Sequence, residues 1–309
     1  MSGEKEEIGQ ARSRLFLLFA RLVADGLDPD LIRECAVLPE LGDLIDQERD
    51  ADQEAADHHD LFGFRVPPYA GVFLDETGHV GGRTGDEALA AYVETGMDRI
   101  RDDLGPDHLA TQLEFLAYCS HRGLEEAARS FIDRQVLSWL PGLVAVVARE
   151  PYPAYRGLLP VLEEAVREYR ASLGGPATPV KDEPAAEDLL SDPKTGVRDV
   201  ASFLGTPALS GIWIGRGDVE RIGRETGVPR GFGGRLTMLT NLLRSAAEYD
   251  QVDPTLSAVD RIASGTAGHW RSAGGPWAGV WIRRIERTRR MLAEIGGRIG
   301  DESDQSPES

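Results

Sequence analysis

Lysine, and positive charge in general, is scarce in this sequence of 309 residues. Lysine occurs at only three positions, and Lys and Arg together number 34 against 52 Asp and Glu, which gives a formal net charge of -18. Nucleic acids and anionic membrane surfaces are bound by clusters of Lys and Arg, so this balance argues against both as partners. A basic partner fits an acidic protein better.

Cysteine and long apolar runs are also scarce. Cys35 and Cys119 lie far apart in apolar, helical surroundings, and a secreted protein of this size more often has several cysteines. We therefore expect two free, buried thiols in a reducing compartment. No run approaches the roughly 20 apolar residues that span a bilayer. The first residues contain no apolar core before a small-residue cleavage site, so the sequence predicts a cytoplasmic protein.

Apolar residues recur at helical spacing along most of the chain, and no convincing set of strands with alternating apolar and polar residues occurs. This pattern predicts an all-α protein. Residues 1–173 are expected to form one helical bundle that closes with a long helix over 154–173. Residues 174–196, rich in proline, glycine and acids, are expected to be an interdomain linker. Helical periodicity resumes over 197–299, which predicts a second, smaller helical domain, and residues 300–309 are expected to be a disordered tail.

The least helical part of the first domain is LFGFRVPPYAGVFLDETGHVGG, residues 61–82. Two consecutive prolines force an extended path, and several glycines allow tight turns. One interpretation is a local hairpin, with a strand at 72–74 and a turn at Thr77 and Gly78. The other is an ordered loop that Tyr69 and Phe73 hold against helices.

A helix is expected to start at Gly105-Pro106 and to run to Cys119. Its apolar residues share one broad face, and the opposite face is expected to be exposed, with four polar residues: Asp107, Thr111, Glu114 and Tyr118. Asp107 would lie in the first turn, against the positive end of the helix dipole. His108 projects toward the apolar side, where a neighbouring segment must meet it, and a half-buried histidine is the common outcome there.

Residues that could bind a metal or a nucleotide are scattered along the chain. Structural zinc needs four ligands in closely spaced pairs, and the candidate ligands lack such spacing: His58, His59, His79, His108, Cys119 and His121. Glycine-rich turns at Gly215 and Gly231 could hold an anion with Arg230 and Arg235, but they lack the P-loop lysine and a βαβ unit, so helix capping is favoured. No nucleophile motif such as G-x-S-x-G stands out. We therefore expect no metal, no cofactor and no enzymatic activity.

Three motifs follow one another in the first domain. They are LFGFRVPPYAGVFLD with GHVGG after it, then GPDHLATQLEFLAY, then FIDRQVLSWLP. Together they resemble the TorD/DmsD/NarJ group of maturation chaperones for molybdenum enzymes, and the resemblance covers roughly residues 11–173. Two stretches of the second domain, TPALSGIW and PRGFGGRLTMLTNLL, are similar to extensions of long bacterial members of the group, for which the resemblance implies no role.

The resemblance implies an all-helical cytoplasmic chaperone. Members of the group bind the apo catalytic subunit of a molybdopterin-dependent oxidoreductase, often through its twin-arginine signal peptide, and hold it until the cofactor is inserted. Client-binding roles are implied for Tyr69, Asp107 and His108. Structural support is implied for Pro67, Pro68, Glu114 and Trp139. Gln112 departs from the group, in which many members have an acid or a small residue, so the resemblance does not fix the contact chemistry of this face.

A non-enzymatic chaperone for a molybdoenzyme is therefore the leading hypothesis. An acidic chain suits a client segment with a positive start and an apolar middle. Two alternatives stay open. One is a helical interaction or regulatory module without a role in cofactor maturation, for which Asp107 and His108 are only a helix start. The other is a nucleotide-dependent enzyme that uses the turn at Gly215 or Gly231.

Overall fold

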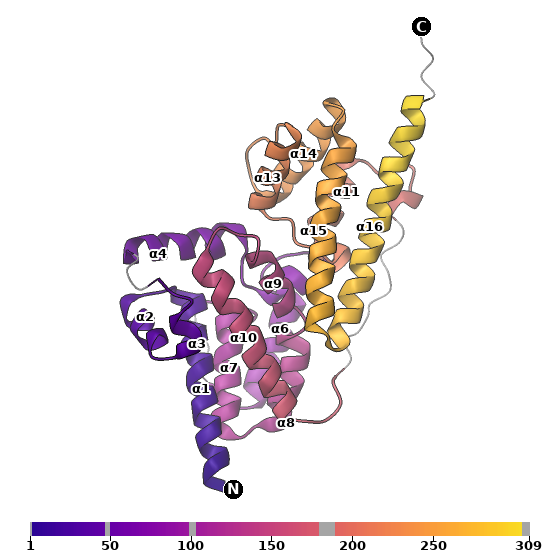
Figure 1. The fold of residues 1–309 in the computed structure, drawn as a ribbon. Coiled ribbons are helices and arrows are strands. Elements are labelled where there is room, and N and C mark those ends of the chain that lie inside the picture. The colour runs from indigo at the N-terminus through magenta and orange to yellow at the C-terminus, as the bar shows by residue number, and fades with distance from the viewer. Residues whose placement is uncertain (1, 47–49, 99–102, 179–188, 305–309) are drawn as a thin grey trace. The chain divides into compact units, whose positions relative to one another are not determined.

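A computed structural model describes the backbone of residues 2–46, 50–98, 103–178 and 189–304 (Figure 1). Helices and helical turns make up the regular structure of these ranges, and their β pairing is limited to one isolated antiparallel bridge, between Tyr69 and His108. The expected all-α class is confirmed. No helix in the described ranges is long and apolar enough to cross a membrane.

The chain divides into two compact units, called here unit 1 (Met1–Val180) and unit 2 (Lys181–Ser309). The described helices of unit 1 are α1 (Ser2–Asp25), α2 (Pro29–Ala36), α3 (Pro39–Gly42), α4 (Ala51–His58), the π-helical turn η1 (His59–Arg65), α5 (Ala70–Leu74), α6 (Gly82–Glu94), α7 (Leu109–Arg122), α8 (Glu125–Phe131), the π-helical turn η2 (Ile132–Val136), α9 (Leu140–Val147) and α10 (Pro153–Ser172). Those of unit 2 are the 3-10 turn η3 (Leu189–Ser191), α11 (Val197–Leu204), α12 (Pro207–Ser210), α13 (Arg216–Thr226), α14 (Arg235–Glu248), α15 (Val252–Ala273) and α16 (Gly275–Asp304).

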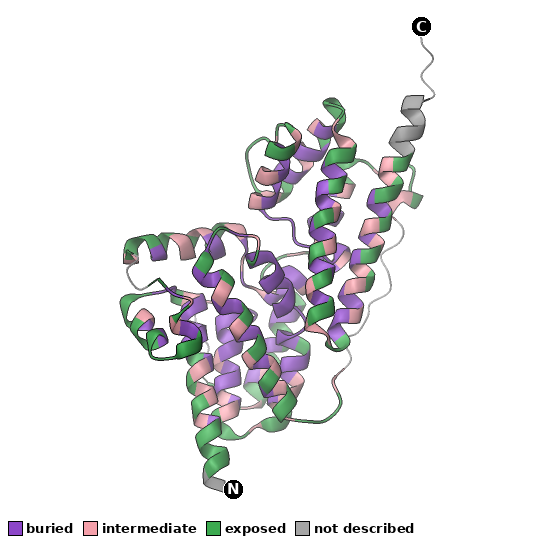
Figure 2. Cartoon of the chain, viewed as in Figure 1, coloured by how far each residue is buried: buried purple, intermediate pink, exposed green. Residues whose placement is uncertain are grey.

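Unit 1 is built around α7, which packs along α1. Phe16 and Phe19 of α1 are fully buried. The rings of Tyr92, Phe115 and Phe131 pack on one another with centroids 4.5 to 5.6 Å apart. Figure 2 shows burial along most of α7 and all of α9. Because each large apolar side chain stabilises the fold by roughly 1.5–3 kcal/mol when it is fully buried, these two helices hold the centre of the unit.

The exposed face expected for α7 is wrong near its start. Asp107 and Thr111 are fully buried, while Glu114 and Tyr118 are half-buried. The helix begins at Leu109, so the residues before it are free to fold back over this side. The Thr111 hydroxyl, for example, donates to the Gly105 carbonyl at 3.1 Å. Periodicity sorts the faces of a helix, but it does not tell which face other segments cover.

The hairpin interpretation of residues 61–82 is also wrong. Residues 70–74 form the helical turn α5, and its Phe73 packs against Trp139 with ring centroids 5.2 Å apart. Tyr69, just before this turn, pairs with His108 and not with a neighbouring strand. The structure supports the ordered-loop interpretation, because the contacts that hold the segment come from distant parts of the chain.

The segment after α10 is attached to unit 1 at its start. Arg170 of α10 donates to the Pro176 carbonyl at 3.0 Å and to the Asp133 carboxylate at 2.6 Å. The Thr178 N–H donates to the same carboxylate at 2.8 Å. Residues 179–188 of the expected linker lie outside the described residues.

Unit 2 is organised by a long helical hairpin of α15 and α16. Gly274 and Gly275 make its turn with φ values of 66° and 82°, a left-handed region that favours glycine. Beside the turn the indoles of Trp270 and Trp281 stack, with centroids 5.1 Å apart and planes 9° apart. Helices α13 and α14 pack on α15, and α12 packs on α16.

Helix α16 is longer than expected. It continues to Asp304, so residues 300–304 are helical where the sequence predicts a disordered tail, and residues 305–309 lie outside the described residues. No proline interrupts the sequence between Pro276 and Pro307, and a helix without such a break can continue into a polar segment.

Both cysteines are buried and free. Burial raises the pKa of the Cys35 thiol to about 11 and that of Cys119 to about 12. Because the thiolate is the nucleophile, we expect neither to react with a chromogenic thiol reagent at pH 8 until urea unfolds the chain. The unfolded thiols titrate near 8.5 and release their protons first, so these groups also lower the free energy of unfolding as the pH rises from about 9 through 11. Rapid reaction of the native protein would contradict this expectation.

Candidate functional site

Two segments that are distant in sequence meet at the start of α7. The Ala70 N–H donates to the Asp107 carbonyl at 2.9 Å, and the Leu109 N–H donates to the Pro68 carbonyl at 2.8 Å. These two bonds form the antiparallel bridge between Tyr69 and His108. The prolines fix an extended backbone that offers carbonyls without competing N–H groups. The structure thus brings together the residues that the sequence singled out in two motifs.

His108 caps α7 and packs on Tyr69. Its Nδ1 accepts from the Ala110 N–H at 3.2 Å, which places the imidazole proton on Nε2. Its ring meets the Tyr69 ring edge to face, with centroids 4.7 Å apart. His108 is buried, whereas Tyr69 is half-exposed. His108, which the sequence places where a neighbouring segment must meet it, therefore caps the helix N-terminus and supports the tyrosine ring.

Asp107 lies inside the protein, with no exposed surface. Its Oδ2 accepts from the Gly71 N–H and from the Gly81 N–H, both at 3.1 Å. Its Oδ1 has no hydrogen-bond partner among the described residues. The carboxylate joins α5, the loop before α6 and the start of α7, so it holds the backbone that carries Tyr69.

Glycine is required where the backbone closes on this carboxylate. A Cβ at Gly71 would lie 2.7 Å from the Gly81 carbonyl oxygen and 2.9 Å from Asp107 Oδ2. A Cβ at Gly105 would lie 3.1 Å from Asp107 Oδ1. Side chains at these positions would compete with the hydrogen bonds of Asp107 for the same space.

Trp139 is fully buried and supports α5 through its contact with Phe73. Its Nε1 donates to the Gln135 carbonyl at 2.7 Å and lies 3.2 Å from Gln112 Oε1. Gln112 is itself fully buried, so the residue that departs from the related group contacts the tryptophan. Glu114 is half-buried and lies five residues beyond the start of α7 at Leu109, about 7.5 Å along the helix axis, so it stands apart from this group.

The ionisation of Tyr69 is shifted by its surroundings. Burial raises the pKa of its phenol, and the negative charges of Asp107 and Asp103 raise it further. The phenol is therefore neutral and able to donate at physiological pH. Asp103 is exposed, which puts a carboxylate at the surface close to the tyrosine.

Sequence reasoning did not identify Gly71, Gly81 or Asp103 as parts of the site, and it noted Gln112 only as a departure from the related group. The glycines stand in the quoted motifs as A-G-V and V-G-G, and the Asp-Asp pair before Leu104 is visible as well. Their roles depend on which backbone atoms meet, which no local pattern reveals.

Several residues that the sequence offered as metal or anion ligands have other contacts in the described part of the chain. No group of three His, Cys, Asp or Glu side chains within the described ranges could hold a metal ion. Arg235, considered as an anion ligand, stacks on Trp213 at 4.0 Å and donates to the carbonyls of Gly205 and Ile214 at 2.7 and 3.3 Å. Burial lowers its pKa to about 10. At the other turn, Asp218 accepts from the Gly215 N–H at 3.0 Å, which is a helix cap.

Comparison with known protein families gives one match. Residues 29–145 match the model of a family described as the nitrate reductase delta subunit. Searches of curated proteins and of solved structures gave no match. The matched range contains both segments of the site and Trp139, and it confirms the resemblance drawn from the three motifs.

Proposed function

We propose that this chain binds one specific client, because residues 29–145 match the model of the nitrate reductase delta subunit family, which is a family of molybdoenzyme maturation chaperones. The client is the apo catalytic subunit of a molybdopterin-dependent oxidoreductase or its twin-arginine signal peptide. The chain holds this client in the cytoplasm until the cofactor has been inserted. Holding a client acts through mass action and needs no catalytic residue.

The observation that carries the proposal is the bridge between Tyr69 and His108, together with the buried Asp107 carboxylate that binds the backbone next to it. Tyr69 is the member with exposed surface, and an aromatic ring with a polar tip is a common anchor in protein interfaces. Asp107 and His108 are buried. We therefore assign client contact to Tyr69 and positioning to Asp107 and His108.

The charge around the site supports a client segment that carries arginine. Asp103 is exposed and near enough to Tyr69 to affect its pKa. A guanidinium of the client could pair with this carboxylate while its apolar residues meet the tyrosine ring. Exposed Asp103 is thus a better partner for a client arginine than Asp107, which solvent does not reach.

Replacing Tyr69 with alanine should weaken client binding about tenfold, which corresponds to roughly 1.4 kcal/mol. The reason is the loss of the partly exposed ring while the bonds of Asp107 stay in place. Isothermal titration of the full chain with a synthetic twin-arginine signal peptide of a molybdopterin-dependent oxidoreductase measures this change.

Tyr249→Ala is the matched control, because Tyr249 is 57% exposed and belongs to unit 2. The control should bind the peptide as the unmodified chain does. Asp107→Asn tests positioning: we expect its affinity and its thermal stability to fall together. Unchanged affinity of the Tyr69→Ala variant, with the peptide bound tightly by the unmodified chain, would overturn the assignment of the contact.

A helical interaction module without a maturation role is the second candidate. The burial of Asp107 and the capping role of His108 favour it, because each residue then has a structural role that needs no client. Cells that produce only the Tyr69→Ala, Asp103→Ala double variant discriminate the two functions. Normal molybdoenzyme activity in these cells, with the variant folded, would favour the module, and loss of activity would favour the chaperone.

A further inference from the structure

Charge is distributed unevenly along this chain. Residues 189–300 contain 16 Lys and Arg against 11 Asp and Glu, whereas residues 1–188 contain 18 against 37. The helices of unit 2 are therefore net basic, although the chain as a whole carries -18. The two parts suit partners of opposite charge.

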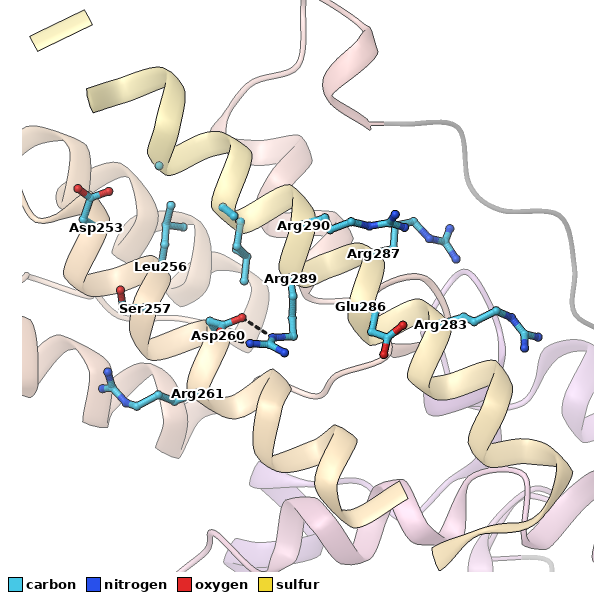
Figure 3. Close-up of a pocket in the computed structure, with 13 residues that line it drawn as sticks. Asp253, Leu256, Ser257, Asp260, Arg261, Arg283, Glu286, Arg287, Arg289 and Arg290 are labelled. Carbon is cyan, nitrogen blue, oxygen red and sulfur yellow. Dashed lines mark hydrogen bonds and ion pairs between the residues drawn. The ribbon is translucent and has the colours of Figure 1, made fainter. Parts of the chain in front are cut away.

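The positive charge of unit 2 is concentrated on α16. Its residues 283–290, RRIERTRR, include five arginines and one glutamate. Arg283, Arg287 and Arg290 are spaced four and three residues apart, so they form a row along one side of the helix. Figure 3 shows their side chains extending from this side. Among the described residues, Arg287 and Arg290 have neither a hydrogen-bond partner nor an ion-pair partner.

The arginine row borders an open cleft of about 1280 Å³ along α15 and α16 (Figure 3). The pair of Asp260 and Arg289 crosses from one helix to the other, with N···O distances of 2.7 and 3.1 Å. Ser257 and Ala293, which have small side chains, line the cleft beside this pair. A second backbone could therefore approach α15 and α16 closely.

We propose that this cleft and the arginine row bind an acidic helix of a partner protein. From Arg283 to Gly296 the lining spans fourteen residues of α16, about 20 Å or between three and four turns of helix. A partner helix of this length with carboxylates spaced four and three residues apart would place each one beside an arginine. Arginine forms bidentate pairs with carboxylates, which favours this chemistry.

The lining also discriminates between anionic partners. Asp253 and Glu286 lie among the arginines, and they would repel the continuous phosphates of a nucleic acid. A partner helix can instead present its own cations to them. The total charge of -18 further disfavours an extended polyanion at long range.

This site is separate from the proposed client site, because every residue that lines it belongs to unit 2. It would give the chain a second partner surface, for acidic segments, in addition to the surface for a basic client segment. The outcome of a test of this second surface does not depend on the roles of Tyr69 and Asp107.

The test uses the full chain and a fluorescent, alanine-rich helical peptide of four turns. Three glutamates of this probe have the spacing of the arginine row, and a second probe has glutamines instead. We expect the glutamate probe to bind and the Arg287→Gln, Arg290→Gln double variant to bind it about tenfold more weakly, as judged by anisotropy. A photo-cross-linking residue at Ala293 should capture the probe, and one at exposed Glu248 should not.

The matched control is the Arg224→Gln, Arg244→Gln double variant. It removes the same charge from exposed positions of unit 2 that do not line the cleft. This control should bind the probe as the unmodified chain does, with the same helix content by circular dichroism in both variants.

Three results would overturn the proposal. They are equal affinity for the glutamate and glutamine probes, preferential binding of a DNA duplex that depends on Arg287 and Arg290, and a dimer in light scattering that only the cleft variant dissociates. The last result would assign the cleft to a second copy of the chain.

Discussion

Replacing Asp133 with alanine should lower the free energy of unfolding of unit 1 by about 3–5 kcal/mol. Asp133 is fully buried and holds Arg170 through two bonds of 2.6 and 3.1 Å. The Arg170 side chain is only 11% exposed, so the substitution leaves a guanidinium without a carboxylate in a desolvated place. Losing the acceptor of the Thr178 N–H adds to the effect.

Asp260→Ala is the matched control. Asp260 also binds its arginine, Arg289, through two bonds of 2.7 and 3.1 Å, but these side chains are 36% and 41% exposed. Solvent screens such a pair, and we expect a loss of about 1 kcal/mol or less. Scanning calorimetry measures both variants, and each should shift the transition of its own unit. Equal shifts would show that burial does not decide the strength of these pairs.

Replacing Trp139 with alanine should destabilise unit 1 by about 3–5 kcal/mol. The substitution removes a fully buried side chain and its contact with Phe73 of α5. It also removes the donor that serves the Gln135 carbonyl. Because α5 follows Tyr69 directly, binding of the signal peptide should weaken in the same variant.

Trp139→Phe separates the two contributions. It keeps a six-membered ring in the site and removes the indole N–H with part of the indole volume, for which we expect a loss of about 1–3 kcal/mol. Phe232→Ala is the control for loss of an aromatic side chain, because Phe232 is 95% exposed and should change stability by less than about 0.5 kcal/mol. Urea unfolding followed by circular dichroism compares the three. A Trp139→Ala variant as stable as Phe232→Ala would contradict the supporting role.

The helices that periodicity predicts best are those with one clear apolar stripe. The long helix expected over 154–173 is α10, which runs from Pro153 to Ser172. Its apolar residues repeat regularly because only one side meets the core. Short elements such as α5 escape this reasoning, since five residues complete little more than one turn.

The site itself was only partly predictable. The motifs identified Tyr69, Asp107 and His108, and the structure brings these three together. Their division into exposed and buried members was not predictable, because the partners of Asp107 are backbone N–H groups of Gly71 and Gly81. Every residue except proline has a backbone N–H. A pattern of side chains therefore does not indicate which N–H binds the carboxylate.

Charge gives a further example. The total of -18 predicts an acidic protein, yet it hides the basic helices of residues 189–300. A net charge summed over both units hides the difference in charge between their surfaces. The row on α16 becomes visible only when the helix that carries Arg283, Arg287 and Arg290 is known.

The carboxylate of Asp107 has a consequence for the order in which unit 1 can open. It ties together residues 36 positions apart, Gly71 and Asp107, and α5 and α6 lie inside the loop that this contact closes. The entropy cost of closing a loop of that length arises when this contact forms. Contacts inside the closed loop then join residues that are already close together. Helices α5 and α6 should therefore separate from the core as one cooperative unit. The surface that carries Tyr69 would then be either fully formed or absent. It would exist only while the whole loop is folded.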